Sequence, residues 1–386
     1  MASSRIAEIF QGDFDGIEAT SISISDVKHL SSYNWIEAQS PTIAVPGTPA
    51  CWSPPTGPQQ VKMDSGVYFI SENAVRHPKS PLEPLFRALY LENPSFDIRS
   101  IDVVADRNTI RQLLSFINPG LEKGKSRNFT IHVEVVKNTA ILCRVGKPQL
   151  QFIRPGQHCG FGHNFEKRYT IHRVKDSSSH HRIISYDFGA LKFLIRHETD
   201  GYVAADTAES STAVNQSTYD SISSKMNSVS LSQPDLSLHT THTESGLSIR
   251  KDGEAVPLAS TLEIKTGNIK RVITMREFAS QLWISQTPKL VRAYHTEGKF
   301  QPPEVEDAVA AVKSWEDQNQ VDLRKLAALI HRIIEVTKGC GGTATIGLQD
   351  QSKKLTIDKA DIGRMLPMDL YAKWDEEKPE LEREKS

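Results

Sequence analysis

The amino-acid sequence predicts an α/β fold with a mixed central sheet flanked by helices. Segments with alternating apolar residues, typical of strands, are interspersed with segments whose apolar residues recur every three or four positions, typical of helices. Some neighbouring strand segments are joined by two-residue turns and others by a helical segment, which favours a sheet of mixed direction. The 386 residues can bury a sizeable core. We expect one domain over residues 1–372, followed by a charged tail at 373–386.

The N-terminal region, residues 1–80, is rich in Ser, Pro and Gly and shows little periodicity. Each proline in 46–55 fixes its own φ and disfavours helix at the preceding residue, so this stretch is expected to be extended. Short apolar pieces at 41–46 and 66–70 are expected to be strands. The large aromatic side chains of the region are expected to be buried, and these are Trp35, Trp52, Tyr68 and Phe69.

The middle of the chain contains clear helical and strand patterns. Apolar residues keep to one face of the segments 81–90 and 107–117, which predicts two helices, and Asp106 stands where it could cap the second. A strand is expected between them at 100–105. Two β-hairpins are predicted, one from 129–136 with 139–144 and one from 182–188 with 191–198.

The later part of the chain begins with an unusual segment. Residues 207–245 are dominated by Ser and Thr with almost no aromatic residues, so we expect a disordered insertion. The Gly-Cys-Gly-Gly run at 339–342 predicts the end of a helix. The elements expected after the insertion are a strand at 258–266, a helix at 274–285, a strand at 289–294, amphipathic helices at 303–318 and 321–338, and a hairpin at 343–357.

The composition excludes several classes of protein. With 46 basic and 47 acidic residues the formal net charge is −1, so the whole chain is not of the strongly basic kind that binds nucleic acid through bulk charge. The 4 cysteines are scattered without CxxC spacing, which fits a reducing compartment. The N-terminus lacks the apolar core of a signal peptide, and no run of about 18 apolar residues could span a bilayer. We therefore expect no membrane partner and a location in the nucleus, the cytoplasm or both.

Several predicted strands carry acidic residues that suggest a site. Alternation along 258–266 places Glu263 and Lys265 on one face of an otherwise apolar strand. Acids gathered at a sheet edge repel one another unless a cation lies between them. The further acids that we expect near this strand are Glu166, Glu198 and Asp200.

The residue types in this set suit one kind of chemistry. Hard divalent cations such as Mg²⁺ bind oxygen ligands and keep several waters, so a few carboxylates suffice to hold them. Two such ions can clamp the attacking and leaving oxygens of a phosphodiester during in-line displacement. Lys265 would position or help to activate the attacking water. The pattern therefore predicts a metal-dependent nuclease site.

The ordered motifs resemble the decapping exoribonuclease (DXO) family, within the PD-(D/E)XK nuclease-like group. Gly162-His-Asn-Phe-Glu166 resembles the G-φ-x-φ-E motif of that family, Glu198-Thr-Asp200 its E-φ-D motif, and Glu263-Ile-Lys265 its E-φ-K motif. Phe278-Ala-Ser-Gln281 resembles its W-x-x-Q helix, with Phe in place of Trp. The chain departs from the family at Ala293-Tyr-His295, where the family has G-φ-R.

The resemblance covers roughly residues 129–300 and implies a PD-(D/E)XK-like nuclease core. It implies a divalent-metal-dependent enzyme, with Mg²⁺ or Mn²⁺ as cofactor, that removes defective or noncanonical 5′ ends from RNA and degrades RNA 5′ to 3′. The implied partners are RNA 5′ ends and a partner exoribonuclease. The implied metal ligands are Glu166, Glu198, Asp200 and Glu263. The implied catalytic residues are Glu263, Lys265, Asp200 and Gln281. The implied substrate-binding residues are Arg144, Gln281 and His295.

Other interpretations stay open beside this one. The altered motifs also fit a catalytically inactive relative that binds RNA or a partner nuclease, or a DNA-directed PD-(D/E)XK nuclease. His158, Cys159 and His163 suggest zinc ligands, but no matching pair with zinc-site spacing accompanies them. The stretch 120–126 is one residue short of a phosphate-binding P-loop and follows a predicted helix, so we reject it.

Overall fold

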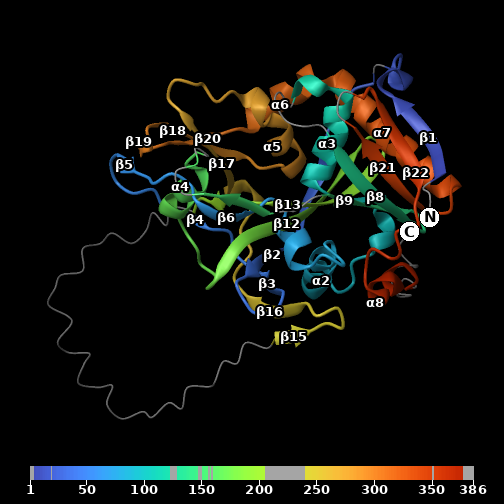
Figure 1. Cartoon of the computed structure of the whole chain (residues 1–386), viewed down its shortest axis with the longest axis horizontal. Coiled ribbons are helices and arrows are strands. Elements are labelled where there is room, and N and C mark those ends of the chain that lie inside the picture. Colours follow the sequence, from blue (N-terminus) through green and yellow to red (C-terminus); the bar gives the residue numbers. More distant parts are fainter. Residues whose placement is uncertain are drawn as a thin grey trace, which may run out of the picture.

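The structure is a computed structural model of the chain. Within its described residues, two sheets and a separate two-stranded ribbon form the framework, and helices cover both faces of the larger sheet (Figure 1). None of the helices in the described residues has the length and apolar character that a membrane span needs. The described residues are 4–18, 20–121, 128–146, 150–154, 157, 160–204, 240–349 and 352–376.

The larger sheet mixes parallel and antiparallel neighbours. Across the sheet, the strands of the described ranges lie in the order β1 (Ser4–Phe10), β22 (Lys354–Lys359), β21 (Thr343–Leu348), β8 (Phe129–Val136), β9 (Thr139–Val145), β7 (Val103–Asp106), β13 (Leu191–Glu198), β12 (Ser177–Phe188), β2 (Ser25–Ile36), β3 (Thr42–Pro46), β16 (Ser248–Asp252) and β15 (Thr240–His242). β13 is parallel to β7 and antiparallel to β12, where His181 lies opposite Glu198. The end of β13 is therefore held in register from both sides.

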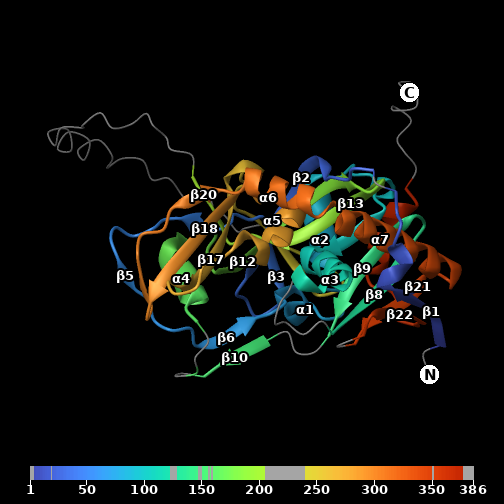
Figure 2. The same ribbon diagram turned by 90° about the horizontal axis from the view of Figure 1, so that it is seen from above.

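The smaller sheet carries the strand with the predicted Glu263 and Lys265. Its strands lie in the order β11 (Thr170–Ile171), β4 (Cys51–Trp52), β14 (Gly201–Tyr202), β17 (Thr261–Asn268), β18 (Lys289–Thr296), β19 (Lys299–Phe300) and β5 (Gln59–Gln60), with β20 (Val305–Asp307) beside β18. β17 and β18 are parallel. The ribbon is separate and consists of β6 (Gly66–Phe69) and β10 (Leu150–Ile153), seen at the edge of the molecule in Figure 2.

Helices occupy the connections between strands. The α-helices of the described ranges are α1 (Glu72–Arg76), α2 (Glu83–Glu92), α3 (Arg107–Ile117), α4 (Gly162–Tyr169), α5 (Ala279–Ser285), α6 (Val309–Gln318), α7 (Gln320–Gly339) and α8 (Met368–Tyr371). Short 3-10 turns are η1 (Gln11–Phe14), η2 (Ile98–Ser100), η3 (Pro119–Leu121), η4 (Leu258–Ser260), η5 (Met275–Glu277) and η6 (Ala372–Trp374).

Buried apolar side chains join these layers. One core lies between a face of the larger sheet and helices α3, α5 and α7, with Ile195 and Ile330 among its members. A second core lies on the opposite face against α2 and α8 and includes Trp35. A third core, around Phe165 and Ile264, joins α4 to the smaller sheet. Burial of apolar area in these layers is the main stabilising contribution to the fold.

The mixed α/β architecture predicted from the sequence is confirmed. The predicted helix at 107–117 is α3, with the same bounds, and the predicted hairpins are β8–β9, β12–β13 and β21–β22. The helix expected at 321–338 is α7, which ends at Gly339 as the glycine-rich run predicted. That the ordered residues form one domain stays a prediction.

Three local expectations differ from the structure. Phe69 is 38% exposed rather than buried, because it belongs to the ribbon. Asp106 makes no cap hydrogen bond to α3, since its carboxylate pairs with Arg196 Nε at 2.7 Å. The helix expected at 303–318 begins later than predicted, because its first part forms the strand β20, which pairs with β18. Two prolines come just before this strand and disfavour helix.

The expected insertion and tail are described only in part. Residues 240–242 form β15, so the predicted disorder is wrong for this end of the segment 207–245. The residues 207–239 and 377–386 lie outside the described residues.

Candidate functional site

The two sheets meet where β13 ends. The chain leaves the larger sheet after Glu198 and enters the smaller one at Gly201, the first residue of β14. Gly201 pairs with Leu262, the residue before Glu263. A Cβ on residue 201 would lie 2.9 Å from the carbonyl oxygen of Ala50, so only glycine allows the chain to pass here. This crossing brings the acids of β13 next to those of β17.

Hydrogen bonds fix the acids at this crossing. The backbone N–H of Ile264 donates to Asp200 Oδ2 at 2.7 Å. Glu263 is 2% exposed, and its Oε1 accepts hydrogen bonds from Lys265 Nζ at 2.5 Å and from Gln281 Nε2. Alternation along the strand predicted that Glu263 and Lys265 share a face, and this is confirmed. Gln281 reaches them from α5.

A basic residue that the sequence analysis did not identify completes this group. Arg107 is the first residue of α3, and its Nη1 donates to Glu263 Oε2 at 3.3 Å. Arg107 is 7% exposed, and its Nε has no hydrogen-bond partner among the described residues. In the sequence, Arg107 could have been noticed because it directly follows a predicted strand and begins a predicted helix. The distance of 156 residues to Glu263 kept the pair from being recognised.

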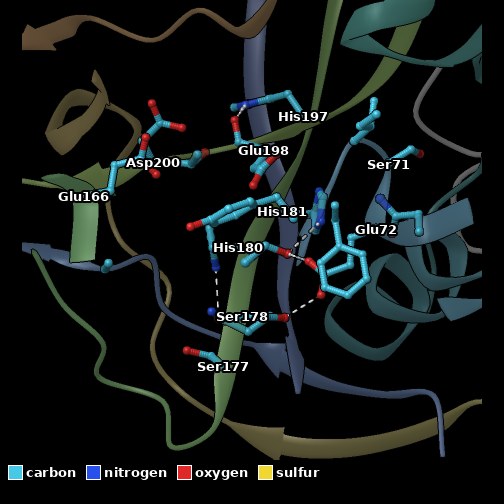
Figure 3. A pocket seen from close by; sticks show the side chains of 18 of the residues that line it. Ser71, Glu72, Glu166, Ser177, Ser178, His180, His181, His197, Glu198 and Asp200 are labelled. Atoms are coloured by element: carbon cyan, nitrogen blue, oxygen red, sulfur yellow. Dashed lines mark hydrogen bonds between the residues drawn. The ribbon is translucent and has the colours of Figure 1, made fainter. Parts of the chain in front are cut away.

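A cavity of about 430 Å³ opens in front of the acids. Figure 3 shows Glu166 and Asp200 next to each other on one side of the cavity, with Glu72 and Ser178 on the other side. The site residues in the cavity lining are Glu166, Glu198, Asp200, Arg107 and Arg144. Three of the predicted metal ligands therefore line the cavity together with the guanidinium groups of Arg107 and Arg144.

The wall opposite the acids is polar and held by hydrogen bonds. The Glu72 carboxylate accepts from Ser178 Oγ at 2.5 Å and from Ser179 Oγ. Ser179 Oγ also lies 3.1 Å from His181 Nε2. Because Glu72 is 6% exposed and has these partners, this wall is pre-formed.

The environment raises the pKa of the cavity acids. Burial, and then the charge of Glu263, raises the pKa of Asp200 to about 8. Burial, followed by the charge of Glu72, raises the pKa of Glu198 to about 7 even though this side chain faces the open cavity. Burial and the charge of Asp200 hold the pKa of Glu166 well above its ordinary value. A raised pKa favours the protonated form of each acid, and a bound cation would favour the ionised form.

Glu263 behaves differently because it has basic neighbours. Burial acts to raise its pKa, but Lys265 and Arg107 outweigh burial, so the pKa of Glu263 is lowered. Burial acts to lower the pKa of Lys265, but the charges of Glu263 and Asp200 outweigh it and the pKa is raised. Glu263 and Lys265 therefore form an ion pair at neutral pH.

The donor chemistry of the site fits a hard divalent cation. Carboxylate oxygens are the ligands that Mg²⁺ and Mn²⁺ prefer, and a bound cation would offset both the burial and the neighbouring negative charges that raise the pKa of Glu166 and Asp200. Among the described residues, no group of three or more His, Cys, Asp or Glu side chains is already arranged around one point. Cation binding would therefore require the acids to turn towards one another.

Two of the predicted substrate-binding residues have different surroundings. Arg144, in β9, lines the cavity. His295 is 9% exposed and packs against the rings of Phe161 and Phe300, at centroid distances of 4.5 and 4.9 Å. Its Nδ1 accepts from the backbone N–H of Gly298 at 3.3 Å. The structure brings Arg144 to the acids and places His295 in an aromatic cluster away from the cavity lining.

The residues of the possible zinc site and of the rejected P-loop-like stretch are described only in part, and His163 is among the residues that line the cavity. His163 stacks on Tyr68 in the described structure, whereas His158 and Cys159 lie outside the described residues. Most of the stretch 120–126 lies outside them as well.

Comparisons with known proteins address the family and the fold. A family model described as a domain of unknown function (DUF8563) matches residues 11–360. No curated protein matches the sequence.

Solved structures of Rai1 share the fold of this chain. Rai1 of S. pombe has 9% identity and a TM-score of 0.56, with 92% of this chain and 99% of that chain covered. Scheffersomyces stipitis Rai1 in complex with (3′-NADP)⁺ and a calcium ion has 11% identity and a TM-score of 0.57, with 97% and 99% covered. Candida albicans Rai1 in complex with pU5 and Mn²⁺ has 9% identity and a TM-score of 0.55, with 97% and 99% covered.

The PD-(D/E)XK-like core and the likeness to the decapping exoribonuclease family, both expected from the motifs, are confirmed at the level of the fold. With a family match that spans 11–360, the chain belongs to the DUF8563 family, and it is built on the fold of the Rai1 structures.

Proposed function

We propose that this protein is a divalent-metal-dependent nuclease that removes defective or noncanonical 5′ ends from RNA and degrades RNA from the 5′ end. One observation carries the proposal. The crossing between the two sheets sets three cavity acids beside the buried group of Glu263, Lys265 and Gln281. Like-charged acids in such a cavity are costly for the fold, so they indicate a function that uses them.

The Rai1 structures support this choice of substrate. Candida albicans Rai1 was solved with pU5 and Mn²⁺, and S. pombe Rai1 with 3′-FADP. Those ligands belong to those proteins. This chain shares their fold and also has acids that suit a divalent cation, so RNA 5′ ends are the substrate class that we propose for its cavity.

Each residue of the site has a chemical role in this proposal. Mg²⁺ or Mn²⁺, held by Glu166, Glu198, Asp200 and Glu263, would supply the positive charge that lowers the pKa of a bound water and offsets charge on the scissile phosphate. The Lys265 ammonium stays charged beside Glu263 and can donate a hydrogen bond to the attacking water. Arg107 has an unpartnered Nε beside the cavity and can bind a phosphate oxygen. Gln281 orients the Glu263 carboxylate.

Cleavage of labelled RNAs with and without the Glu263 carboxylate tests the proposal. RNAs with a 5′ monophosphate, a 5′ triphosphate or a cap are incubated with Mg²⁺ or Mn²⁺ and the wild type, Glu263→Ala or the isosteric Glu263→Gln. We expect both variants to lose at least about 100-fold in rate, because the carboxylate holds or orients the cation. Glu335→Ala, whose side chain is 70% exposed, is the matched control. No cleavage by the wild type of any of these RNAs contradicts the proposal.

A second candidate is favoured by the position of Arg107. Its guanidinium already occupies Glu263 Oε2, and a carboxylate that is paired in this way is less available to a metal. An inactive relative that binds RNA or a partner nuclease through the same cavity fits this arrangement. Tight RNA binding without cleavage in the same assay distinguishes it, and competition with labelled DNA tests a DNA-directed enzyme. The partner exoribonuclease and the location in the nucleus or cytoplasm stay predictions.

A further inference from the structure

The β6–β10 ribbon has one face covered with exposed apolar side chains. In this antiparallel pair Val67 lies opposite Phe152 and Phe69 lies opposite Leu150. Directly opposed residues, and residues two apart on one strand, point to the same face. The exposed fractions of these side chains are 60% for Val67, 62% for Phe152, 38% for Phe69 and 42% for Leu150. We call this set the ribbon face.

The opposite face of the ribbon is fixed to the helix that carries Glu166. The Tyr68 ring stacks on His163 of α4 at 3.8 Å and 10°, with Lys167 Nζ 5.7 Å from the same ring. Asp64, just before the ribbon, accepts the backbone N–H of His163 at 3.2 Å. The ribbon is therefore held at a defined position beside the acids.

The ribbon is continuous with the cavity and is accompanied by basic groups. Residues 67–70 all belong to the cavity lining, which also includes Arg144 and Lys167. The Arg76 guanidinium lies 5.0 Å from the centroid of the Phe69 ring and covers one of its faces. The Arg76 guanidinium is ion-paired with Glu37 and Glu72, so the positive charge near the ribbon face comes from Arg144 and Lys167 of the cavity lining. A ligand at this place meets apolar side chains on the ribbon face and these two basic groups in the cavity. Single-stranded nucleic acid has that distribution, with bases on one side and phosphates on the other.

The spacing of the two phenylalanines also suits bases. Phe69 and Phe152 are diagonal neighbours across the ribbon, and diagonal positions are roughly 7–8 Å apart. Neighbouring bases of a strand are about 3.4 Å apart, so side chains from positions at this separation leave room for one base between them. Leu150 and Val67 complete an apolar border around such a base.

We propose that the ribbon face binds the nucleobases of the RNA strand whose 5′ end occupies the cavity, through stacking on Phe69 and Phe152. The inference rests on the proposed function and deepens that function. It implies that recognition of RNA depends on the nucleotides that follow the 5′ end. Every base has a π-face, so the contact is tolerant of sequence. The protein is thereby expected to prefer an unpaired 5′ segment over a duplex end or an isolated terminal nucleotide.

Fluorescence anisotropy with two RNA lengths tests the ribbon face. The probes are a 5′-phosphorylated oligouridylate of about ten nucleotides and a 5′-phosphorylated dinucleotide, with EDTA present so that no cleavage occurs. We expect Phe152→Leu to weaken binding of the longer RNA by about five- to tenfold, the lower range for loss of one stacked base. Phe152→Trp keeps the ring and should restore the affinity. Phe10→Leu is the matched control, since Phe10 is 46% exposed on β1, far from the ribbon in Figure 1.

Specific outcomes overturn the inference. Equal affinity of Phe152→Leu and wild type for the longer RNA would show that the ring is not used. An equal loss for both RNA lengths would place the effect in the cavity rather than on the ribbon. If Phe152→Asp dissociates a dimer in sedimentation while RNA affinity is unchanged, the ribbon face is a protein interface and the inference is wrong.

Cleavage of the two RNAs is measured separately, with Mn²⁺ in place of EDTA. If the wild type cleaves neither RNA but the expected affinity pattern holds, the ribbon face stands and the nuclease proposal fails. If the wild type cleaves both, the ratio of kcat/KM for the longer to the shorter RNA should fall in Phe152→Leu and stay constant in Phe10→Leu. A constant ratio in Phe152→Leu contradicts the inference.

Discussion

Asp200 is expected to couple the stability of the fold to pH and to divalent cations. Burial, and then the charge of Glu263, raises its pKa to about 8 from an ordinary value of 3.8. Between about pH 4 and pH 8 the native protein therefore keeps a proton that the unfolded chain has released. Stability falls with rising pH wherever the native state binds more protons, so the free energy of unfolding should decrease across this window.

The size of the effect follows from the proton that is retained. One extra bound proton changes the free energy of unfolding by about 1.36 kcal/mol per pH unit, so the upper limit from about pH 5.5 to about pH 7.5 is roughly 2.7 kcal/mol. Asp200 is only partly buried, and solvent screens its repulsion with Glu263. We therefore expect about 1–1.5 kcal/mol. Asp200→Asn removes this titration and should flatten the pH dependence by that amount.

Urea denaturation at several pH values, with EDTA present, measures the difference. The matched control is Asp317→Asn, whose side chain is 61% exposed, and it should keep the slope of the wild type. Adding Mn²⁺ should reduce the slope of the wild type, because a bound cation favours the ionised carboxylates. Parallel pH profiles for the wild type and Asp200→Asn would refute the reasoning, since they would show that Asp200 titrates in the same way in both states.

Two further predictions concern the framework behind the site. Arg196→Gln should lower the free energy of unfolding by about 2–3 kcal/mol in thermal denaturation, because it removes a buried guanidinium whose two hydrogen bonds hold the partly exposed Asp106 carboxylate. A loss below about 1 kcal/mol would contradict this. Gly47→Ala should cost more than about 2 kcal/mol, since its Cβ would lie 2.1 Å from Asn34 Oδ1 and its φ is +64°. Gly57→Ala has a similar φ of +71° but open space around the Cβ, so it should cost only about 1 kcal/mol, and equal losses for the two would rule out the clash.

Local sequence patterns are sufficient to place the individual elements and part of the site. Alternation placed Glu263 and Lys265 on one face, and the structure joins them by a hydrogen bond of 2.5 Å. Periodicity placed α3 at its observed bounds. These predictions succeed because the direction of a side chain along a strand or helix depends on nearby backbone geometry, which repeats every few residues.

Contacts between residues far apart in the sequence depend on the arrangement of the strands and helices. Arg107 contacts Glu263 across 156 residues, and Asp200 is held by Ile264 across 64. Asp106, an apparent helix cap, pairs instead with Arg196, and Phe69 remains on the surface because the ribbon stands apart from the cores. The physical reason is that such contacts depend on strand order and on the close passage at Gly201, where β13 gives way to β14. No local pattern encodes the strand order, so the acids could be recognised from the sequence while the arginine that binds them could not.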